Sequence, residues 1–480
     1  MDHRRSTADV AYDASEAAWE EPATEVQPAL AGRLAGLSLP RQVLVLAVWP
    51  MLEQFLNFLV GTVDLVLAAR LERIGEAAAA ALGVGGYIGW LMGLLHMAVG
   101  VGGAALVARA VGGRHQRLAN AALGQAVLLA VFAGAVLGVL VFAGAGPIAR
   151  LAGAEGEALA LCVLYLRIIA LAAPLSAVLF VGGACLRGAG DTLTPFWVMV
   201  GVNIVNVGTS VWFVQLGWGV AGIALGTLLA WTLGAGLILA MLFRGSRDMR
   251  LRWMRLRPHW HTARRIVRVG VPNLIESSGM WLGNFAVLMI VGRLPLWDLA
   301  PQHIIGVHMI AIRLESVSFL MGAAIGTAAA TLAGQYLGAG QPRRAKQAVG
   351  LCWAVATVLM VLIGLTFIFA PELWTRLISD KPLHLNEAPP VLRIAGFIQI
   401  FFATYIVLSH ALRGAGDTTT AMKMTYASTF LVRLPAAYII AVPLGWGFYG
   451  IWLGLCGELA VRAALFAGRY FHGGWTRVEV

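Results

Sequence analysis

The sequence predicts an all-α integral membrane protein whose twelve transmembrane helices form two parallel six-helix repeats. Two observations lead to this fold class: an apolar composition gathered in long runs, and a motif that occurs twice. Hydrophobic residues make up 59% of the chain and charged residues 12%, against roughly 45–50% and about 25% in soluble domains. The 57 glycines agree with this class, because glycine is more frequent in membrane helices than in soluble ones.

Twelve apolar runs are long enough to cross a bilayer, since a spanning helix needs about 20 such residues. Six runs precede a basic segment, and they cover residues 42–69, 77–111, 119–146, 157–184, 193–214 and 219–243. Six more follow it, and they cover residues 267–292, 303–337, 346–371, 389–411, 420–442 and 446–469. These spans occupy most of the 480 residues and leave no room for a sizeable soluble domain.

The chain therefore divides into five segments, of which two are helical lobes. We predict an N-terminal six-helix lobe at residues 41–243 and a C-terminal six-helix lobe at residues 267–470. Residues 1–40 are polar and acidic and lack the apolar core of a signal peptide, so we interpret them as a disordered cytoplasmic tail. Residues 471–480 form a second cytoplasmic tail.

The connector between the lobes, residues 244–266, is strongly basic and carries Trp253 and Trp260 among its arginines. We interpret it as an interfacial helix on anionic lipid head groups, where each basic residue contributes about 1 kcal/mol. A regulatory or lipid-sensing segment is the alternative.

The net charge of +11 is interpreted as a sign of membrane orientation and not of nucleic-acid binding. Lys and Arg residues gather in the N-terminal tail, the connector and the loops on one side of the predicted spans, as the positive-inside rule requires. We therefore expect a multi-pass protein of the plasma or inner membrane with both termini in the cytoplasm. The four cysteines lie in or beside apolar runs without the spacing of a metal site, and we interpret them as packing residues.

An internal repeat is the strongest signal in the sequence. The motif LRGAGDT occurs at residues 186–192 and again at residues 412–418, an offset of 226. At the same offset, GVGGAALVARAVGG (100–113) aligns with GTAAATLAGQYLGA (326–339). Because each repeat has an even number of spans, the two halves have the same orientation in the membrane. Transporters built this way bind substrate between the halves and rock one half against the other.

These motifs resemble those of the multidrug and toxic compound extrusion (MATE) family of secondary transporters. The resemblance covers about residues 40–470 and rests on both LRGAGDT loops, GQYLGAGQPRRA at 334–345, AIRLESVSF at 311–319 and LVRLPAAY at 431–438. It implies export of amphipathic organic cations in exchange for H⁺ or Na⁺, without a cofactor. Two alternatives stay open: a flippase of the same superfamily for lipid-linked or polysaccharide precursors, and a membrane-embedded enzyme.

Asp64 is the first candidate for ion coupling, because a charged group inside a membrane is costly and is functional by default. It matches the acid that the family uses in its N-terminal half to exchange a proton or cation for drug. Asn203 and Asn206 match a polar stretch of the fifth span, and we expect them to contribute to the same site. Some relatives carry a second acid where this chain has Val207, so proton coupling is favoured over sodium.

Glu53 and Glu276 occupy corresponding positions near the start of each lobe, shortly after a proline. We expect either acid to face the central cavity and hold the positive charge of a substrate. The alternative is a protonated carboxyl group with a structural role. Three neighbouring polar residues are assigned to the same cavity: Gln54, Asn57 and Asn284.

The remaining charged motifs are expected to serve structure or gating. Arg313 and Glu315 leave a helix on opposite sides, so each is expected to have its partner on another helix. Glu458 and Arg462 are four residues apart and are expected to pair.

The two RGAGDT loops lack the Gly-Lys-Ser/Thr ending of a nucleotide-binding loop. We interpret them as glycine turns in which Asp191 and Asp417 cap the next helix while Arg187 and Arg413 lie at the cytoplasmic surface. The scattered His96, His308 and His410 are interpreted as interior histidines, so no metal is expected. Nothing in the sequence requires more than a monomer.

Overall fold

The computed structural model describes residues 30, 34–69, 71, 75–245, 249–253, 256–293 and 301–479. Within this part of the chain, ten helices are long and apolar enough to cross a membrane, and a bent helix pair makes an eleventh span. Together with the 31-residue helix α2 (Leu39–Ala69), they form the twelve spans, so the predicted all-α membrane fold is confirmed.

The N-terminal lobe consists of six long helices joined by short turns. They are α2, α3 (Gly75–Gly112), α4 (Gln116–Leu151), α5 (Gly156–Gly188), α6 (Leu193–Gln215) and α7 (Gly219–Arg244). The first LRGAGDT motif is the turn between α5 and α6. Gly190 has φ of +88° there, and Gly416 has +86° in the second copy. Only glycine adopts this conformation without strain, which explains why both turns use it.

The C-terminal lobe repeats this plan with two irregular spans. Its helices are α8 (Trp260–Arg293), α9 (Pro301–Gly338), α10 (Pro342–Phe369), α11 (Pro371–Arg376), α12 (Pro382–Phe397), α13 (Gln399–Gly414), α14 (Thr418–Tyr426), α15 (Leu434–Ala441) and α16 (Gly447–His472). The helices α12 and α13 form one span bent by 58°. At the break, the buried side chain of Gln399 donates to the carbonyl of Ala395 (3.0 Å), and neighbouring groups of this kind satisfy the backbone where a span is broken.

A π-helical turn, η3 (Ala427–Arg433), joins α14 to α15 in the other irregular span. Pro435 follows it closely and has no N–H to give to the preceding turn. Such wide turns are frequent at functional sites, and this one carries Arg433 of the buried network described below.

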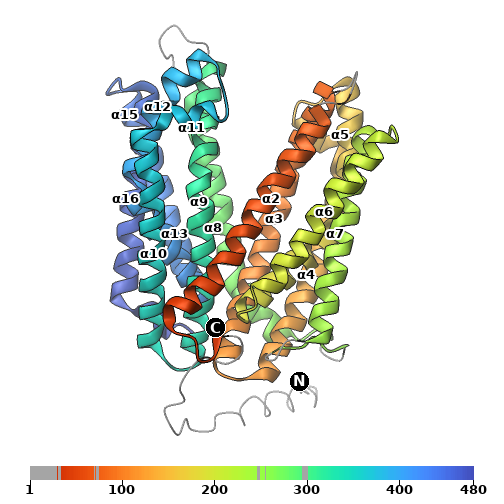
Figure 1. Ribbon diagram of the computed structural model, residues 1–480, viewed down its shortest axis with the longest axis vertical. Coiled ribbons are helices and arrows are strands. Elements are labelled where there is room, and N and C mark those ends of the chain that lie inside the picture. The colour runs from red at the N-terminus through yellow and green to blue at the C-terminus, as the bar shows by residue number, and fades with distance from the viewer. Residues whose placement is uncertain are drawn as a thin grey trace, which may run out of the picture.

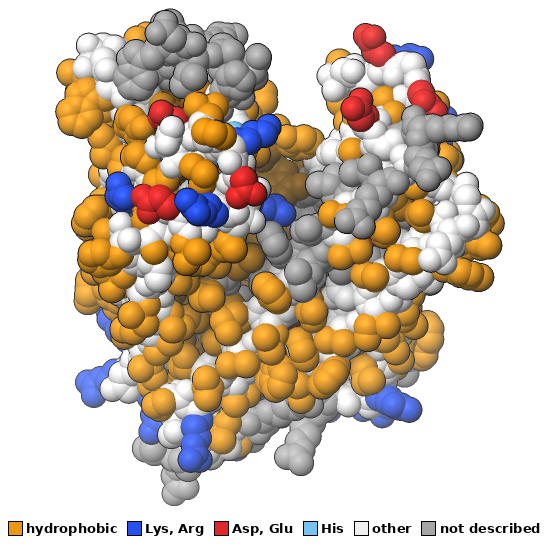
Figure 2. All heavy atoms as spheres, turned by 45° about the horizontal axis from the view of Figure 1, so that its top comes forward, with side chains coloured by type: hydrophobic (Ala, Val, Ile, Leu, Met, Phe, Trp, Pro, Cys, Tyr) orange, Lys and Arg blue, Asp and Glu red, His pale blue; other side chains and the backbone are white. Residues whose placement is uncertain are grey.

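The two lobes meet at one face of the molecule and diverge toward the other (Figure 1). Helices α2 and α3 of the first lobe contact α9 of the second, and α3 also contacts α8. The meeting point lies where α3 and α9 end, at the face rimmed by exposed Arg114, Arg117, Arg343 and Arg344; we call it the basic face. Figure 2 shows a hollow between the lobes at the opposite face.

The segments flanking the lobes differ from the expectation. The interfacial helix predicted for the connector is wrong for residues 249–253 and 256–259, which contain no α-helix. Met249 and Leu251 are instead buried in the core of the first lobe, because this segment packs along α4. Helix α8 begins at Trp260, earlier than predicted.

The N-terminal tail is described only in its last part. Leu30 and Leu34 are buried in a cluster dominated by the second lobe. Residues 1–29 and 31–33, for which disorder was predicted, lie outside the described residues.

Candidate functional site

A cavity of about 330 Å³ lies between the lobes, above their contact at the basic face. Helices α2, α3 and α5 contribute from the first lobe, and α9 and α13 contribute from the second. Most of the wall is glycine, alanine, valine, methionine and phenylalanine. Its polar lining residues are Gln54, His96, Arg187, Thr327, Thr331, His410 and Arg413. Among the described residues, no Asp or Glu lines this cavity.

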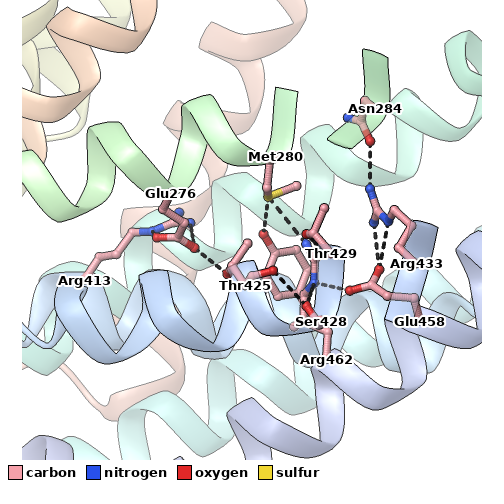
Figure 3. A network of polar contacts seen from close by, with 11 residues as sticks. Glu276, Met280, Asn284, Arg413, Thr425, Ser428, Thr429, Arg433, Glu458 and Arg462 are labelled. Atoms are coloured by element: carbon pink, nitrogen blue, oxygen red, sulfur yellow. Dashed lines mark hydrogen bonds and ion pairs between the residues drawn. The ribbon is translucent and has the colours of Figure 1, made fainter. Parts of the chain in front are cut away.

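Each lobe carries one ion pair beside the cavity, at corresponding positions. In the first lobe, Arg187 Nη1 on α5 donates to both carboxylate oxygens of Glu53 on α2, at 3.0 and 3.1 Å. In the second lobe, Arg413 Nη2 on α13 donates to Glu276 Oε1 on α8 at 2.9 Å (Figure 3). The hydroxyl of Thr425 donates to the same oxygen at 2.8 Å.

These pairs correct two expectations. Arg187 and Arg413 do not lie at the surface: their side chains are 20% and 12% exposed. A helical side chain points back toward the N-terminus of its helix, so an arginine in the last turn reaches into the lobe. Glu53 and Glu276 are bound to these arginines and do not line the cavity, so neither carboxylate is free to hold a cation in this conformation.

Asp64 is arranged differently. It is buried on α2, and its carboxylate lies beside the side chains of Asn206 on α6 and Thr227 on α7. These two residues also bond to each other, from Asn206 Nδ2 to Thr227 Oγ1 (3.1 Å). Asp64 Oδ1 is buried without a hydrogen-bond partner, and Tyr165 on α5 is close enough for electrostatic contact. No Lys or Arg within the described ranges pairs with Asp64.

The other polar residues assigned from the sequence are dispersed. Asn203 is buried and donates to the Met199 carbonyl of its own helix (2.6 Å). Gln54 lines the cavity. The side chain of Asn57 lies outside the described residues. Asn284 belongs to a network in the second lobe, where it accepts from Arg433 Nη1 (2.7 Å).

That network is a buried chain of charges centred on Glu458 (Figure 3). Arg433 Nη2 donates to Glu458 Oε2 at 2.8 Å, and Arg462 Nε donates to Oε1 at 2.6 Å. Arg462 also donates to the hydroxyls of Ser428 and Thr429 in the π-helical turn. Glu458 and Arg462 are fully buried and Arg433 is 4% exposed. This network therefore joins α16 to the span that contains the π-helical turn η3. The expected pairing of Glu458 with Arg462 is confirmed.

Of the remaining charged residues, Arg433 is the electrostatic neighbour of Glu315, and Arg313 has a polar or electrostatic contact. Asp191 accepts the backbone N–H of Thr194 at 3.1 Å, as a cap of α6 should. Asp417 differs: its side chain makes no capping bond and instead accepts from Arg469 Nε on α16 (2.8 Å). The bond to Arg469 joins two charged groups, whereas a capping bond to a backbone amide has a charge on the carboxylate only.

Two residues that the sequence interpretation missed close the lobes at the basic face. Arg109 Nη2 on α3 donates across the interface to the carbonyl of Ala415 (2.9 Å). Gln335 Nε2 on α9 donates in the other direction to the carbonyl of Gly188 (2.9 Å). Both acceptors lie in the RGAGDT turns. The repeat alignment already contained the signal, because Arg109 and Gln335 occupy the same position at the offset of 226.

Of the three histidines interpreted as interior residues, only one lies in the core away from the cavity. His96 and His410 line the cavity, while His308 is buried against Trp452. His96 stacks on Phe180, and neither of its ring nitrogens has a protein partner. Over the described ranges, no three His, Cys, Asp or Glu side chains are grouped as metal ligands.

Comparison with known proteins gives matches over nearly the whole chain. A family model described as MatE matches residues 50–212 and residues 272–439, one stretch in each lobe. A Thermotoga maritima protein described as "Probable multidrug resistance protein NorM" is 28% identical over 445 residues, covering 92% of this chain and 94% of that protein.

Two solved structures share the fold. One, described as "Crystal structure of MATE in the bent conformation", has a TM-score of 0.84 at 20% identity and covers 91% of this chain and 96% of its own. The other is described as "Outward-facing conformation of a multidrug resistance MATE family transporter of the MOP superfamily". It has a TM-score of 0.84 at 19% identity and covers 92% of this chain and 98% of its own.

Proposed function

Because the chain belongs to the MATE family, we propose that it is a multidrug efflux antiporter that exports hydrophobic organic cations in exchange for protons. One observation carries this proposal. Asp64 is buried without a basic partner among the described residues, whereas the acids Glu53, Glu276 and Glu458 are each bound to arginine. Glu315 on α9 has the guanidinium group of Arg433 as its electrostatic neighbour, whereas no such neighbour of Asp64 is found in the described part of the chain. Asp64 is therefore the carboxyl group that we assign to gaining and losing a proton during transport.

The exchange follows from electrostatics in a site of low polarity. Burial favours the neutral, protonated form of a carboxyl group, while a nearby positive charge favours the ionised form. An organic cation that approaches Asp64 therefore expels its proton, and a returning proton releases the cation. Both ligands compete for one charge, which couples their movements in opposite directions.

The composition of the Asp64 site favours protons over sodium. Hard metal cations take several oxygen ligands, with carboxylates prominent among them. The described neighbours of Asp64 offer the amide of Asn206 and the hydroxyls of Thr227 and Tyr165, and none of them is a second carboxylate. Val207 follows Asn206 and supplies no oxygen from its side chain.

Alternating access would move the cavity between the two sides of the membrane. We place the basic face in the cytoplasm, because positively charged loops stay on that side. With the lobes in contact there, this conformation would be open to the outside. Rocking about the helices that join the lobes would open the basic face and expose the cavity to the cytoplasm.

A flippase for anionic lipid-linked precursors is the second candidate, and the cavity wall is the observation that favours it. Arg187, Arg413 and two histidines line the cavity, and no described acid does. Each arginine is nevertheless bound to a glutamate, which reduces its attraction for an anion. For this reason the antiporter is the leading proposal.

The test is ethidium transport in proteoliposomes driven by an imposed pH gradient or an imposed Na⁺ gradient. We expect the pH gradient alone to drive transport by the parent protein. Asp64→Asn should fall to the rate of protein-free liposomes, while Asp64→Glu, which keeps a titratable group, should retain activity. Transport driven only by Na⁺ would contradict the proton coupling. If neither gradient moves ethidium or other organic cations through folded protein, the flippase becomes the better proposal.

A further inference from the structure

A short C-terminal tail, residues 473–479, follows helix α16. After His472, Gly473 adopts a left-handed conformation with φ of +75° and reverses the chain. A short 3₁₀ helix, η4 (Gly474–Arg477), follows. Its Trp475 is completely buried in the core of the second lobe and stacks on Tyr470. The indole N–H of Trp475 donates to the Tyr470 carbonyl (3.1 Å), so this tail is firmly anchored to the second lobe.

Beyond this anchor the tail reaches the first lobe. Arg109 Nη2, which donates to the Ala415 carbonyl, also donates to the Val478 carbonyl at 2.6 Å. Glu479 lines a hollow at the basic face together with Arg109 on α3 and Arg265 on α8. One guanidinium group of α3 thus binds two segments of the other lobe, and the tail is one of them.

The equivalent position in the second lobe lacks this arrangement. Gln335 corresponds to Arg109, and among the described residues it donates to the Gly188 carbonyl alone and its buried Oε1 atom has no partner. On that side the chain continues from α7 through the connector into α8. The tail contact is therefore an addition to the bonds that join each RGAGDT turn to the opposite lobe.

We propose that residues 473–479 form a strap that holds the basic face closed through Arg109. Opening this face separates α3 from α9 and from the second RGAGDT turn, so it must break the bonds of Arg109 to Ala415 and Val478. Arg109 is a positioning residue in this scheme and does not touch the cavity. The strap biases the molecule toward the conformation seen here, and it rests on the alternating access proposed above.

The test measures the conformational equilibrium by electron spin resonance, with one spin label on each lobe. Arg117 and Arg343 are exposed at the basic face and correspond in the repeat, while the native cysteines are all buried. Labels on Arg117→Cys and Arg343→Cys therefore report the opening of that face as a longer distance. The first variant deletes residues 477–480, which removes Val478 but keeps the Trp475 anchor. The second is Arg109→Gln, which gives the first lobe the side chain of the second.

We expect the deletion to raise the ratio of open to closed basic face by about tenfold, which corresponds to about 1.4 kcal/mol. Arg109→Gln should raise it further, because this change weakens both bonds. In the Arg109→Gln background the deletion should add almost nothing, since both changes remove the same contact. Arg109→Lys, which keeps the charge, should restore part of the closed population.

An unchanged distance distribution after the deletion would overturn the strap. Equal effects of the deletion in the parent and in Arg109→Gln would also overturn it, because the tail would then act elsewhere. Thermal unfolding of each variant establishes that it is folded. The spin-label distances report conformation and not transport. They therefore test the strap even if the Asp64 experiment contradicts proton coupling.

Discussion

The two lobes share a fold, a motif and an Arg–Glu pair at corresponding positions, yet Asp64 in the first lobe and Glu458 in the second have opposite electrostatic surroundings. In the first lobe, Asp64 lies among an asparagine, a threonine and a tyrosine, without a basic partner in the described part of the chain. In the second lobe, Glu458 lies between Arg433 and Arg462 and is bound to both. The same backbone fold therefore holds an acid without a basic partner among the described residues in one lobe and an acid bound to two arginines in the other.

This difference separates a site that can change its charge from one that cannot. For an isolated carboxyl group in an apolar environment, the ionised and neutral forms are close in free energy, because desolvation opposes ionisation. A carboxylate between two guanidinium groups is stabilised as an ion, and each partner would be left uncompensated without it. We infer that the first lobe carries the coupling chemistry through Asp64, while the Glu458 network of the second lobe serves structure.

The largest expected effect is on the second lobe. Glu458→Gln leaves two buried guanidinium groups without their counter-charge, which should lower the free energy of unfolding by roughly 3–5 kcal/mol. Thermal unfolding of purified protein measures the loss. Glu372→Gln is the matched control, because Glu372 pairs with Arg393 at a distance of 2.8 Å but both side chains are about half exposed, where a pair contributes about 0–1 kcal/mol. Similar losses for the two variants would show that burial of the network does not matter.

A smaller effect is expected where the lobes are equivalent. Gly112 and Gly338 correspond in the repeat, and a Cβ at either position would overlap the backbone carbonyl of Gln335 or Arg109 in the opposite lobe. Gly112→Ala and Gly338→Ala should each disfavour closure of the basic face by about 1–3 kcal/mol, the usual cost of overpacking. The spin-label distance between positions 117 and 343 measures this shift.

Gly89→Ala on α3 is the control for these two variants, because a Cβ there meets no atom within 4 Å. The two gate variants should shift the equilibrium by similar amounts, while the control should leave it unchanged. A large effect at one glycine and none at the other would mean that the gate is not two-fold symmetric in its backbone.

The fold was predictable from the sequence because its signals are local or periodic. Twelve apolar runs gave the spans, and two copies of LRGAGDT gave the repeat. The ion pairs were not predictable, since Glu53 and Arg187 are 134 residues apart and their contact depends on how α2 and α5 are placed within the folded lobe. Arg187 was expected at the surface because it ends a helix, but its side chain points back along α5 into the lobe.

The candidate site was predicted in its components and not in its geometry. Asp64 and Asn206 were both chosen from the sequence, and they lie together. Thr227 and Tyr165 were missed, because a single threonine or tyrosine in an apolar helix carries no distinguishing pattern. The gate pair Arg109 and Gln335 was visible in the repeat alignment, but an arginine aligned with a glutamine does not reveal a bond across the interface.

The smallest expected effect compares the two ion pairs that flank the cavity. Glu276 is 1% exposed and accepts from both Arg413 and Thr425, whereas Glu53 is 10% exposed and bound to Arg187. Removing a charge from the more buried and more fully bonded site costs more, because the partners left behind cannot reach water. Glu276→Gln should therefore lower the free energy of unfolding by about 1 kcal/mol more than Glu53→Gln, as measured by thermal unfolding. An equal or reversed order would mean that the site beside Glu53 is at least as poorly hydrated in the membrane as the site beside Glu276, and the electrostatic contrast between the lobes would then be confined to Asp64 and Glu458.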